Sequence, residues 1–247
     1  METVLITGAS RGIGRATALL AAERGWQVVI NYRIDHEAAA EAAAEVQRRG
    51  SRATTVRGDV SVEADVVGMF REAHADLGPL DGVVINAGIV APAMRLADMT
   101  AERLQRIFQV NVLGAYLCAR EAARALSRSR GGKGGSIVIV SSAAARLGSP
   151  GEYVDYAGSK GALDTLTIGL AKELGAEGVR VNAVRPGLIA TEIHATSGDP
   201  DRARKLGGAA PLGRAGQPEE IAEAIVWLLS GSASYVTGSI LDVAGGR

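Results

Sequence analysis

The chain has 247 residues, a length that suits one large domain or two small ones. Its 27 basic and 27 acidic side chains cancel, so net charge gives no electrostatic reason to expect binding to nucleic acid or to an anionic membrane. Hydrophobic residues make up 47% of the chain and charged residues 22%, a balance typical of globular proteins rather than disordered ones. Glycine is abundant, at 32 residues, close to twice its usual share of about 7%, which indicates that backbone geometry matters here.

Short apolar stretches rich in β-branched residues alternate along the chain with longer stretches of helical periodicity. We expect strands at Thr3–Thr7, Gln27–Asn31, Ala53–Arg57, Asp81–Asn86, Ser136–Ser141, Arg180–Val184 and Ser239–Val243. We expect helices at about Gly12–Arg24, Glu37–Arg49, Glu63–Asp76, Ala101–Ser127, Val154–Leu174 and Pro218–Leu229. Continuous apolar strands joined by crossover helices are typical of parallel sheets. The pattern predicts an α/β fold, a Rossmann-type doubly wound parallel sheet of about seven strands with helices on both faces.

The alternation is not divided by a composition shift or a Pro/Ser-rich linker, so we expect one domain over residues 1–247. The glycine-rich stretch Gly131–Gly135 separates a predicted helix from a predicted strand and is interpreted as a surface turn. The stretch Gly198–Arg214 is polar and contains several glycines, with a short helix predicted at Pro200–Leu206. Such a segment beside a rigid sheet predicts a mobile substrate lid at about residues 188–214.

The N-terminal sequence METVLITGAS has no basic segment followed by an apolar one, and no apolar run approaches the roughly 18 residues that span a bilayer. We therefore expect a cytoplasmic protein without a membrane partner. Cys118 is the only cysteine and lies in an apolar helical stretch, which favours a buried small hydrophobe. His36, His74 and His194 share no metal-ligand spacing, so no metal site is predicted.

A glycine-rich turn follows the first predicted strand and opens the first predicted helix. Backbone amides at a helix N-terminus can approach a pyrophosphate closely where no Cβ intervenes. The spacing G-x-x-x-G-x-G differs from the general dinucleotide fingerprint, but its place between strand and helix predicts a dinucleotide site. The residues proposed to meet the cofactor here are Gly8, Ser10, Arg11, Gly12, Ile13 and Gly14.

The end of the second predicted strand indicates which dinucleotide binds. An acidic residue there would accept hydrogen bonds from a free ribose hydroxyl and repel a 2′-phosphate. The strand instead ends in Asn31-Tyr32-Arg33, and the first turn already carries Arg11. Guanidinium groups suit phosphate oxygens, so NADP(H) is preferred over NAD(H), with Tyr32 and Arg33 as cofactor residues. Asp35 is interpreted as a helix N-cap; the alternative for the two arginines is that they are solvated surface charges.

Tyr156 and Lys160 stand four residues apart in a predicted helix, which places both on one face. An ammonium near a phenol favours the phenolate, so we expect Lys160 to lower the pKa of Tyr156 toward the range of a useful acid or base. Tyr153 has no lysine four residues later and is the poorer candidate. Ser141 and Ser142 end a buried strand, where open α/β sheets bind their ligands.

Together with further motifs, these residues resemble the classical short-chain dehydrogenases/reductases, among them members like 3-oxoacyl-carrier-protein reductases and glucose dehydrogenases. The likeness extends over essentially the whole chain. Its motifs, in order, are the Thr7–Gly14 turn, Asp59-Val60, Asn86-Ala87-Gly88, Asn111, Ser142, the Tyr156/Lys160 pair, and Pro186-Gly187 with Thr191. Two departures stand out. Ile85 replaces an asparagine that many members have, and Ser142 precedes Tyr156 by one residue more than is common, so Ser141 stays an alternative.

The resemblance implies a role for each of four catalytic residues. Tyr156 would be the general acid in carbonyl reduction, and Ser142 would hydrogen-bond the substrate oxygen. Lys160 would hold the nicotinamide ribose, and Asn111 would anchor a water in a proton relay to Lys160. Further cofactor contacts are implied for Asp59, Val60, Asn86, Ala87, Gly88, Tyr156, Lys160, Pro186, Gly187, Ile189 and Thr191.

We therefore expect an NADPH-dependent oxidoreductase that reduces a carbonyl of a small molecule to an alcohol, or the reverse. Its substrate stays open among 3-oxoacyl thioesters, sugars and other ketones, because specificity lies in the loops Val90–Leu96, Gly148–Asp155 and Leu188–Leu212. The alternatives are a non-catalytic NADP-binding regulator and a non-redox lyase or epimerase. The resemblance also implies a homotetramer or homodimer, packed through the helices at Ala101–Ser127 and Val154–Leu174.

Overall fold

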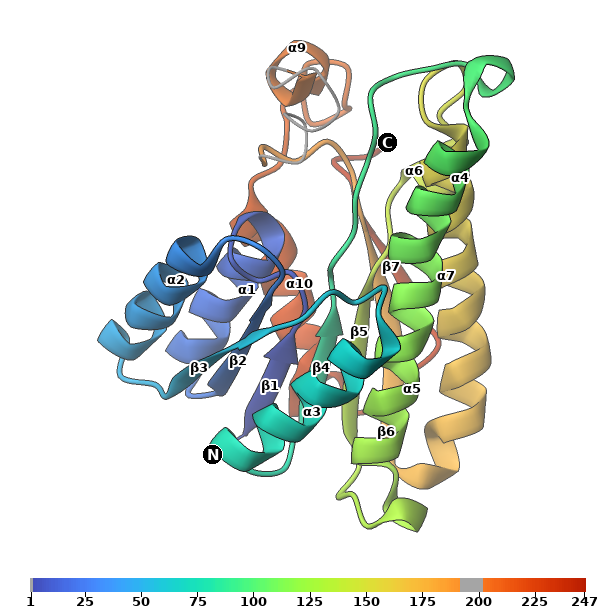
Figure 1. Cartoon of the computed structure of the whole chain (residues 1–247). Coiled ribbons are helices and arrows are strands. Elements are labelled where there is room, and N and C mark those ends of the chain that lie inside the picture. The colour runs from blue at the N-terminus through green and yellow to red at the C-terminus, as the bar shows by residue number, and fades with distance from the viewer. Residues whose placement is uncertain (1, 192–201) are drawn as a thin grey trace.

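The fold is a single parallel sheet of seven strands, seen in a computed structural model that describes residues 2–191 and 202–247 (Figure 1). The strand order is β3-β2-β1-β4-β5-β6-β7, and each neighbouring pair is parallel. The predicted Rossmann-type sheet is confirmed. The strands are β1 Thr3–Ile6, β2 Gln27–Tyr32, β3 Ala53–Arg57, β4 Gly82–Ile85, β5 Gly135–Val140, β6 Val179–Pro186 and β7 Ile240–Val243.

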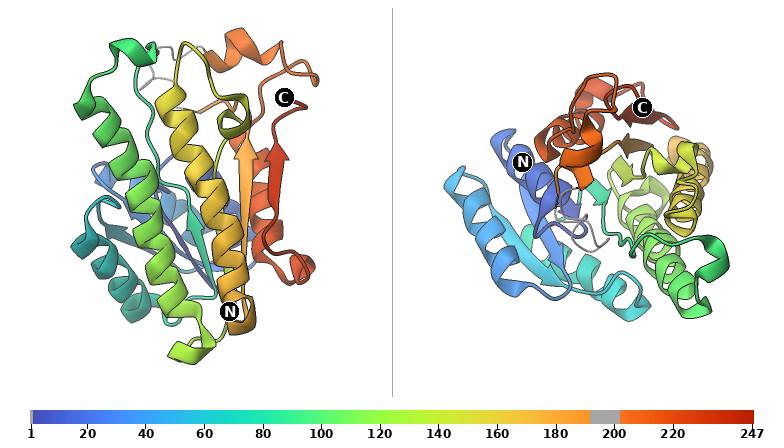
Figure 2. Two further views of the ribbon diagram at one scale, coloured as in Figure 1. Left: turned by 90° about the vertical axis from the view of Figure 1, so that its right-hand side faces the viewer. Right: turned by 90° about the horizontal axis from the view of Figure 1, so that it is seen from above.

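Helices cover both faces of the sheet, because successive strand residues point to opposite sides. In β1, Leu5 packs in the core beneath α3, α5 and α7, whereas Val4 and Ile6 pack in the core beneath α1, α2 and α10. Figure 2 shows α5 and α7 side by side over one face. The helices are α1 Gly12–Glu23, α2 His36–Arg48, α3 Glu63–Leu77, α4 Ala101–Phe108, α5 Gly114–Leu126, α6 Ala144–Leu147, α7 Val154–Leu174, α9 Arg202–Gly207 and α10 Pro218–Leu229.

The predicted long helix at Ala101–Ser127 is not uniform. A π-helical turn, η2 Gln109–Leu113, separates α4 from α5, and Asn111 lies in its middle. Single π-helical turns inside α-helices occur frequently at functional sites. Short 3₁₀ turns occur at η1 Leu96–Asp98, η3 Arg128–Arg130, η4 Gly175–Glu177 and η5 Gly231–Ala233.

The sheet has its topological switch point between β1 and β4, because the strands that follow β1 in the chain lie on one side of this point and the strands that follow β4 lie on the other. Crevices at the carboxyl ends of such strands are where open α/β sheets bind ligands. The two strand ends are tied together by Thr7, whose Oγ1 accepts from the amides of Asn86, at 2.9 Å, and Ala87, at 3.0 Å. The crevice at this point is therefore held rigidly by the strand ends themselves.

Two local expectations, the Asp35 cap and the burial of Cys118, are confirmed. Asp35 caps α2, since its carboxylate accepts from the amide of Ala38 at 3.0 Å. Cys118 is fully buried, and burial raises the pKa of its thiol to about 12. No helix in the described residues is long and apolar enough to cross a membrane. The described residues likewise hold no cluster of three metal-ligating side chains, and His194 lies outside them.

Candidate active site

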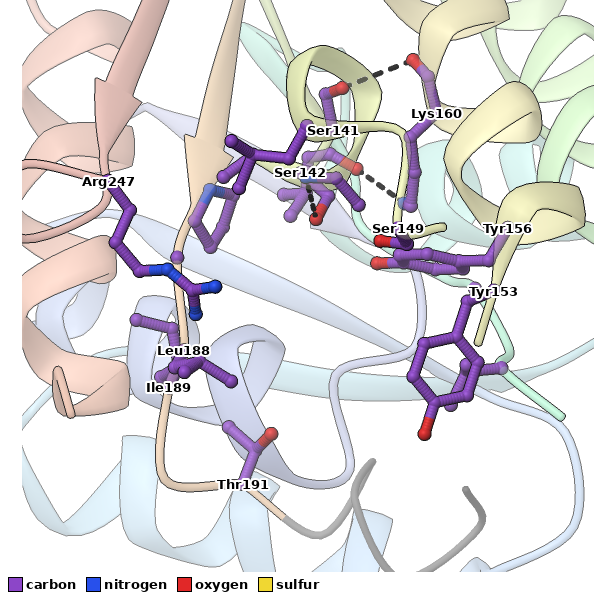
Figure 3. A pocket seen from close by; sticks show the side chains of 18 of the residues that line it. Ser141, Ser142, Ser149, Tyr153, Tyr156, Lys160, Leu188, Ile189, Thr191 and Arg247 are labelled. Carbon is purple, nitrogen blue, oxygen red and sulfur yellow. Dashed lines mark hydrogen bonds between the residues drawn. The ribbon is translucent and has the colours of Figure 1, made fainter. Parts of the chain in front are cut away.

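A cavity of about 360 Å³ opens at the carboxyl end of β5, beside the first turns of α7 (Figure 3). Ser141 and Ser142 reach it from β5, and Tyr156 and Lys160 reach it from α7. The other lining residues are Ile13, Asn86, Gly88, Val90, Val140, Ala143, Ala144, Leu147, Ser149, Pro150, Glu152, Tyr153, Pro186, Gly187, Leu188, Ile189, Thr191 and Arg247. The catalytic serine, tyrosine and lysine predicted from the sequence thus lie in one cavity.

The side chains of Ser142 and Tyr156 both line this cavity, and the Ser142 hydroxyl acts on the Tyr156 phenol. The backbone orients the side chain of Ser142, because its Oγ accepts a hydrogen bond from the amide of Ala144 at 3.1 Å. Burial raises the pKa of the Tyr156 phenol, and the Ser142 hydroxyl opposes that rise. The phenol is therefore protonated at neutral pH, so it can donate a proton to an oxygen that binds beside Ser142.

The neighbouring Ser141 is engaged away from the cavity. Its hydroxyl lies 2.7 Å from Asp164 Oδ1 and 3.2 Å from the carbonyl oxygen of Lys160. Asp164 is in turn paired with Arg185, at 2.8 Å. Ser142, the serine preferred from the sequence, lines the cavity with Tyr156, whereas the hydroxyl of the alternative, Ser141, is bound to Asp164.

Lys160 is buried, and its Nζ donates to the carbonyl oxygen of Val140 at 2.7 Å. Burial lowers its pKa to about 8, and the charge of Asp164 opposes this lowering. Its Nζ lies 5.7 Å from the centre of the Tyr156 ring. The expectation that Lys160 lowers the pKa of Tyr156 is therefore wrong for this geometry, because the ammonium is bonded to the backbone and burial dominates the phenol.

The side chain of Asn111 joins the π-helical turn to the loop after β4. Its Oδ1 accepts from the amide of Ile89 at 2.8 Å, and its Nδ2 donates to the carbonyl of Ile89 at 2.9 Å and to Ser159 Oγ at 3.0 Å. A Cβ on Gly88 would lie 3.4 Å from Asn111 Oδ1 and 3.5 Å from Lys160 Nζ. Asn111 and Lys160 therefore flank the same glycine, although no direct bond joins them among the described contacts.

A second cavity, of about 630 Å³, adjoins the first along the crevice at the switch point. It begins at the glycine turn, where Gly12 has a positive φ of 56° and starts α1. The two cavities share Ile13, Asn86, Gly88, Val90 and Thr191. A long bipartite molecule such as a dinucleotide fits this continuous groove, with one end at the glycine turn and the other beside Tyr156.

Nearly all of the predicted cofactor residues line one cavity or the other, the exception being Gly14. A Cβ on Gly14 would lie 2.5 Å from the carbonyl oxygen of Gly8 and 2.7 Å from Asn86 Nδ2. Gly14 therefore allows α1 to pack against its own preceding turn. A Cβ on Gly187 would lie 2.8 Å from Ala244 Cα, so the absence of a side chain here allows the segment after β7 to pack against Gly187. Gly187 also lines the cavity.

Arginines border the glycine-turn end of the groove. Arg33 lies 3.4 Å from Asp59, and Arg11 and Arg33 both line the cavity. Burial raises the pKa of Asp59, but hydrogen bonds from Ser61 and the charges of Arg33 and Arg106 outweigh it, so the pKa is lowered overall. Arg106 also lines this cavity and was not predicted, since nothing in its sequence position distinguishes it from other arginines on a helix.

The crevice at the switch point, the glycine turn and the Ser142–Tyr156–Lys160 group define an oxidoreductase of the nicotinamide-dependent class. Residues 8–247 match the family described as enoyl-(acyl carrier protein) reductase. The chain is 51% identical over 247 residues to an uncharacterized oxidoreductase, YgfF, of Escherichia coli strain K12, with 100% of each covered.

Two solved structures resemble the chain closely. A short-chain type dehydrogenase/reductase from Mycobacterium marinum matches with a TM-score of 0.92 and 38% identity, covering 99% of this chain and 94% of the other. A 3-ketoacyl-(acyl-carrier-protein) reductase from Brucella melitensis, complexed with NADH, matches with a TM-score of 0.91 and 34% identity, covering 100% and 98%. The chain belongs to the short-chain dehydrogenase/reductase family, an oxidoreductase family that binds a nicotinamide cofactor.

Proposed function

We propose that the protein reduces a carbonyl to an alcohol, or runs the reverse reaction, with Tyr156 as the general acid or base. The observation that carries this proposal is that Ser142, Tyr156 and Lys160 line one cavity that is continuous with the groove at the glycine turn. Two hydroxyl groups that line one cavity can both bind a single substrate oxygen. A bound nicotinamide supplies the hydride that reaches the carbonyl carbon.

The residues act on the oxygen and its proton. Ser142 donates a hydrogen bond to the substrate oxygen and so orients the carbonyl beside Tyr156. Tyr156 donates its proton to that oxygen as negative charge develops there, and its raised pKa keeps the proton available at neutral pH. In the oxidative direction the same phenol must first lose its proton, so alkaline conditions favour that direction.

Lys160 and Asn111 are proposed to bind the cofactor ribose and to relay protons, respectively. The depressed pKa of Lys160, about 8, allows it to exchange a proton near neutrality. Asn111 lies beside Gly88 and Lys160 and holds the loop after β4 in place through both its side-chain polar atoms. A water in a relay would use the space that Gly88 leaves open by lacking a Cβ.

The decisive experiment measures NADPH oxidation against a panel of aldehydes and ketones, with Tyr156→Phe as the test variant. We expect Tyr156→Phe to lose turnover while NADPH titration shows unchanged cofactor affinity. Unchanged kcat in this variant would refute the role of Tyr156. The panel includes an α,β-unsaturated thioester, because the matching family is described by enoyl reduction. Conversion of substrate without net NADPH consumption would support a lyase or epimerase, and cofactor binding without conversion would support a regulator.

We further propose that NADP(H) is preferred over NAD(H). Arg11 and Arg33 both line the glycine-turn end of the groove, and a guanidinium pair suits a 2′-phosphate. Arg33→Asp should shift the ratio of kcat/KM values toward NADH, since it replaces a cation by a carboxylate that accepts from a ribose hydroxyl. A clear NADH preference in the unmodified protein would contradict the proposal. The NADH complex of the Brucella melitensis relative makes this comparison necessary.

Association into a homodimer or homotetramer is proposed from the surface of α5 and α7. Four large hydrophobic side chains at the end of α4, on the π-helical turn and on α5 and α7 are each more than two-fifths exposed: Phe108, Leu113, Tyr116 and Ile168. In the described residues, no atom from outside its own stretch of α7 lies within 4 Å of the place where a Cβ on Gly161 or Gly169 would stand, so a partner helix could approach closely. Light scattering after size-exclusion chromatography tests this, and a clean monomer would reject it.

A single domain over 1–247 with a substrate lid at about 188–214 also stays a proposal. Residues 192–201 of that segment lie outside the described residues. On either side of them, Leu188 and Ile189 line the catalytic cavity, and Ile189 pairs with Gly216 in an isolated bridge. Limited proteolysis with and without NADPH tests the lid, because closure over the cofactor should protect this segment from cleavage.

A further inference from the structure

Arg247 lines the catalytic cavity and approaches it from the side of β7 (Figure 3). Its guanidinium projects into the cavity, whereas Tyr153 and Tyr156 enter from the side of α7. Three charged residues line this cavity among the described ones: Glu152, Lys160 and Arg247. Glu152 stands on the segment before α7, so the two cations and the acid come from three different parts of the chain.

The backbone that carries Arg247 is held in place by several contacts. The amide of Gly187 donates to the carbonyl of Val243 at 3.1 Å, and the amide of Leu212 donates to the carbonyl of Gly245 at 3.1 Å. The guanidinium of Arg146 donates to the main-chain oxygen of Arg247. The segment after β7 is thus bound to β6, to the loop before α10 and to α6. Contacts from three directions fix where the Arg247 side chain begins.

The guanidinium of Arg247 itself has no hydrogen bond or ion pair with any residue of the described ranges 2–191 and 202–247. Lys160 cannot serve a substrate charge in the same way, because its ammonium is buried and bonded to the carbonyl of Val140. Glu152 has interactions of its own within the protein. A guanidinium that has no partner among residues 2–191 and 202–247, at the wall of a partly enclosed, largely apolar cavity, is suited to an incoming planar anion.

We propose that Arg247 binds an anionic group, a carboxylate or a phosphate, on the substrate at a distance from the reacting carbonyl. This inference rests on the proposed carbonyl reduction and names its substrate class. The phosphates of the dinucleotide are not the intended anion, because Arg247 does not line the cavity at the glycine turn. The carbonyl binds between Ser142 and Tyr156, and the anionic end of the substrate extends across the cavity to Arg247.

The test uses matched aldehydes that differ only in charge: 4-formylbenzoate and its methyl ester, with 4-formylphenyl phosphate to distinguish phosphate from carboxylate. We expect Arg247→Gln to lower the ratio of kcat/KM for the acid to that for the ester by about 10- to 100-fold, the worth of a charge-assisted hydrogen bond. Arg247→Lys should retain part of the ratio. Arg71→Gln is the control, because Arg71 is exposed on α3 and lies in neither cavity.

An equal loss on acid and ester in Arg247→Gln would overturn the proposal, since it would indicate a structural role. A wild-type protein that reduces acid and ester equally well would also overturn it. Calorimetry with benzoate and benzamide, on the full chain with NADPH, separates this inference from the proposed function. If no aldehyde is reduced but benzoate binds more tightly to the wild type than to Arg247→Gln, the carbonyl reduction fails and the anion site stands. Equal benzoate affinity in both proteins would reject the site.

Discussion

Arg103 and Asp155 form a buried ion pair one residue away from the candidate acid, Tyr156. Arg103 Nε donates to Asp155 Oδ2 at 2.8 Å, and the two side chains are 11% and 1% exposed. The other carboxylate oxygen, Oδ1, accepts from the backbone amide of Tyr156 at 2.9 Å. The pair therefore joins α4 to the first turn of α7, and the same carboxylate fixes the backbone that carries the phenol.

Removal of one partner of this pair should destabilise the protein strongly. In Arg103→Gln the carboxylate of Asp155 stays buried without its cation, a situation that typically costs about 3–5 kcal/mol. Urea unfolding followed by circular dichroism measures the loss. Arg24→Gln is the matched control, because its pair with Glu223 is 58% and 59% exposed and is worth at most about 1 kcal/mol. Equal destabilisation by the two variants would contradict the importance of burial here.

The two adjacent serines should separate into a catalytic and a structural residue. Ser142→Ala is expected to lower kcat/KM by about 10²- to 10³-fold, because the substrate oxygen loses one of its two donors. Ser141→Ala is expected instead to lower the free energy of unfolding by about 1–3 kcal/mol, since Asp164 loses a buried donor. Steady-state kinetics and urea unfolding on both variants decide the matter. The assignment is wrong if Ser141→Ala loses turnover and keeps full stability.

The sheet could be predicted from the sequence because its strands are local apolar runs. The stretches around Leu5, Val83 and Ile137 are buried on both faces, and each is a short apolar run rich in β-branched residues. The positions of Tyr156, Lys160 and the glycine turn could also be predicted, since their motifs have fixed spacing within one helix or one turn. Features that are set by residues close together in the sequence could be predicted for this reason.

Features that depend on contacts between distant segments could not be predicted. The bond between Ser141 and Asp164 is one such contact, because only the packing of α7 against β5 and β6 brings Asp164 to Ser141. The rise in the pKa of Tyr156 follows from burial, and the sequence spacing suggested the opposite direction. The helical periodicity of Ala101–Ser127 did not predict the π-helical turn at Asn111.

The roles of the glycines also divide into those that the local sequence predicts and those that depend on distant contacts. The turn at Gly131–Gly135 was interpreted as an ordinary surface turn, and it does connect α5 to β5. A Cβ on Gly134, however, would lie 2.5 Å from the carbonyl oxygen of Gly178, a residue more than forty positions away in the chain. This close approach between two loops requires glycine, and only the folded chain reveals it.

Lys160 should make stability depend on pH in a specific window. Its pKa in the folded protein is about 8, against an ordinary value of 10.5, so between these values the unfolded chain binds a proton that the folded chain does not. Stability from this group therefore rises with pH across that window. Below pH 8 the folded state carries the buried charge at a cost of about 3 kcal/mol.

Replacing this lysine tests the pH dependence directly. Lys160→Met removes the buried charge and loses one hydrogen bond to Val140, so we expect a net gain of about 1–2 kcal/mol in cofactor-free protein at pH 7. The gain should shrink as pH rises from 8 to 9.5, because the wild-type ammonium then loses its proton. Urea unfolding across this range measures the difference, and a gain that is independent of pH would refute the depressed pKa.

Two helical glycines should respond to alanine in opposite directions. A Cβ on Gly14 would press against the backbone of Gly8 and Ala9, at 2.5 Å and 2.9 Å, so Gly14→Ala should cost about 1–3 kcal/mol and weaken NADPH binding by displacing the glycine turn. Gly68, in the middle of α3, has nothing within 4 Å of such an atom. Gly68→Ala should therefore stabilise the protein by about 0.5–1 kcal/mol and leave NADPH affinity unchanged. Urea unfolding and NADPH titration on the pair measure both effects. A Gly14→Ala variant that gains stability like Gly68→Ala would contradict this prediction. It would show that the turn can move without loss of stability, so that the close packing of α1 on its turn does not fix the shape of the cofactor site.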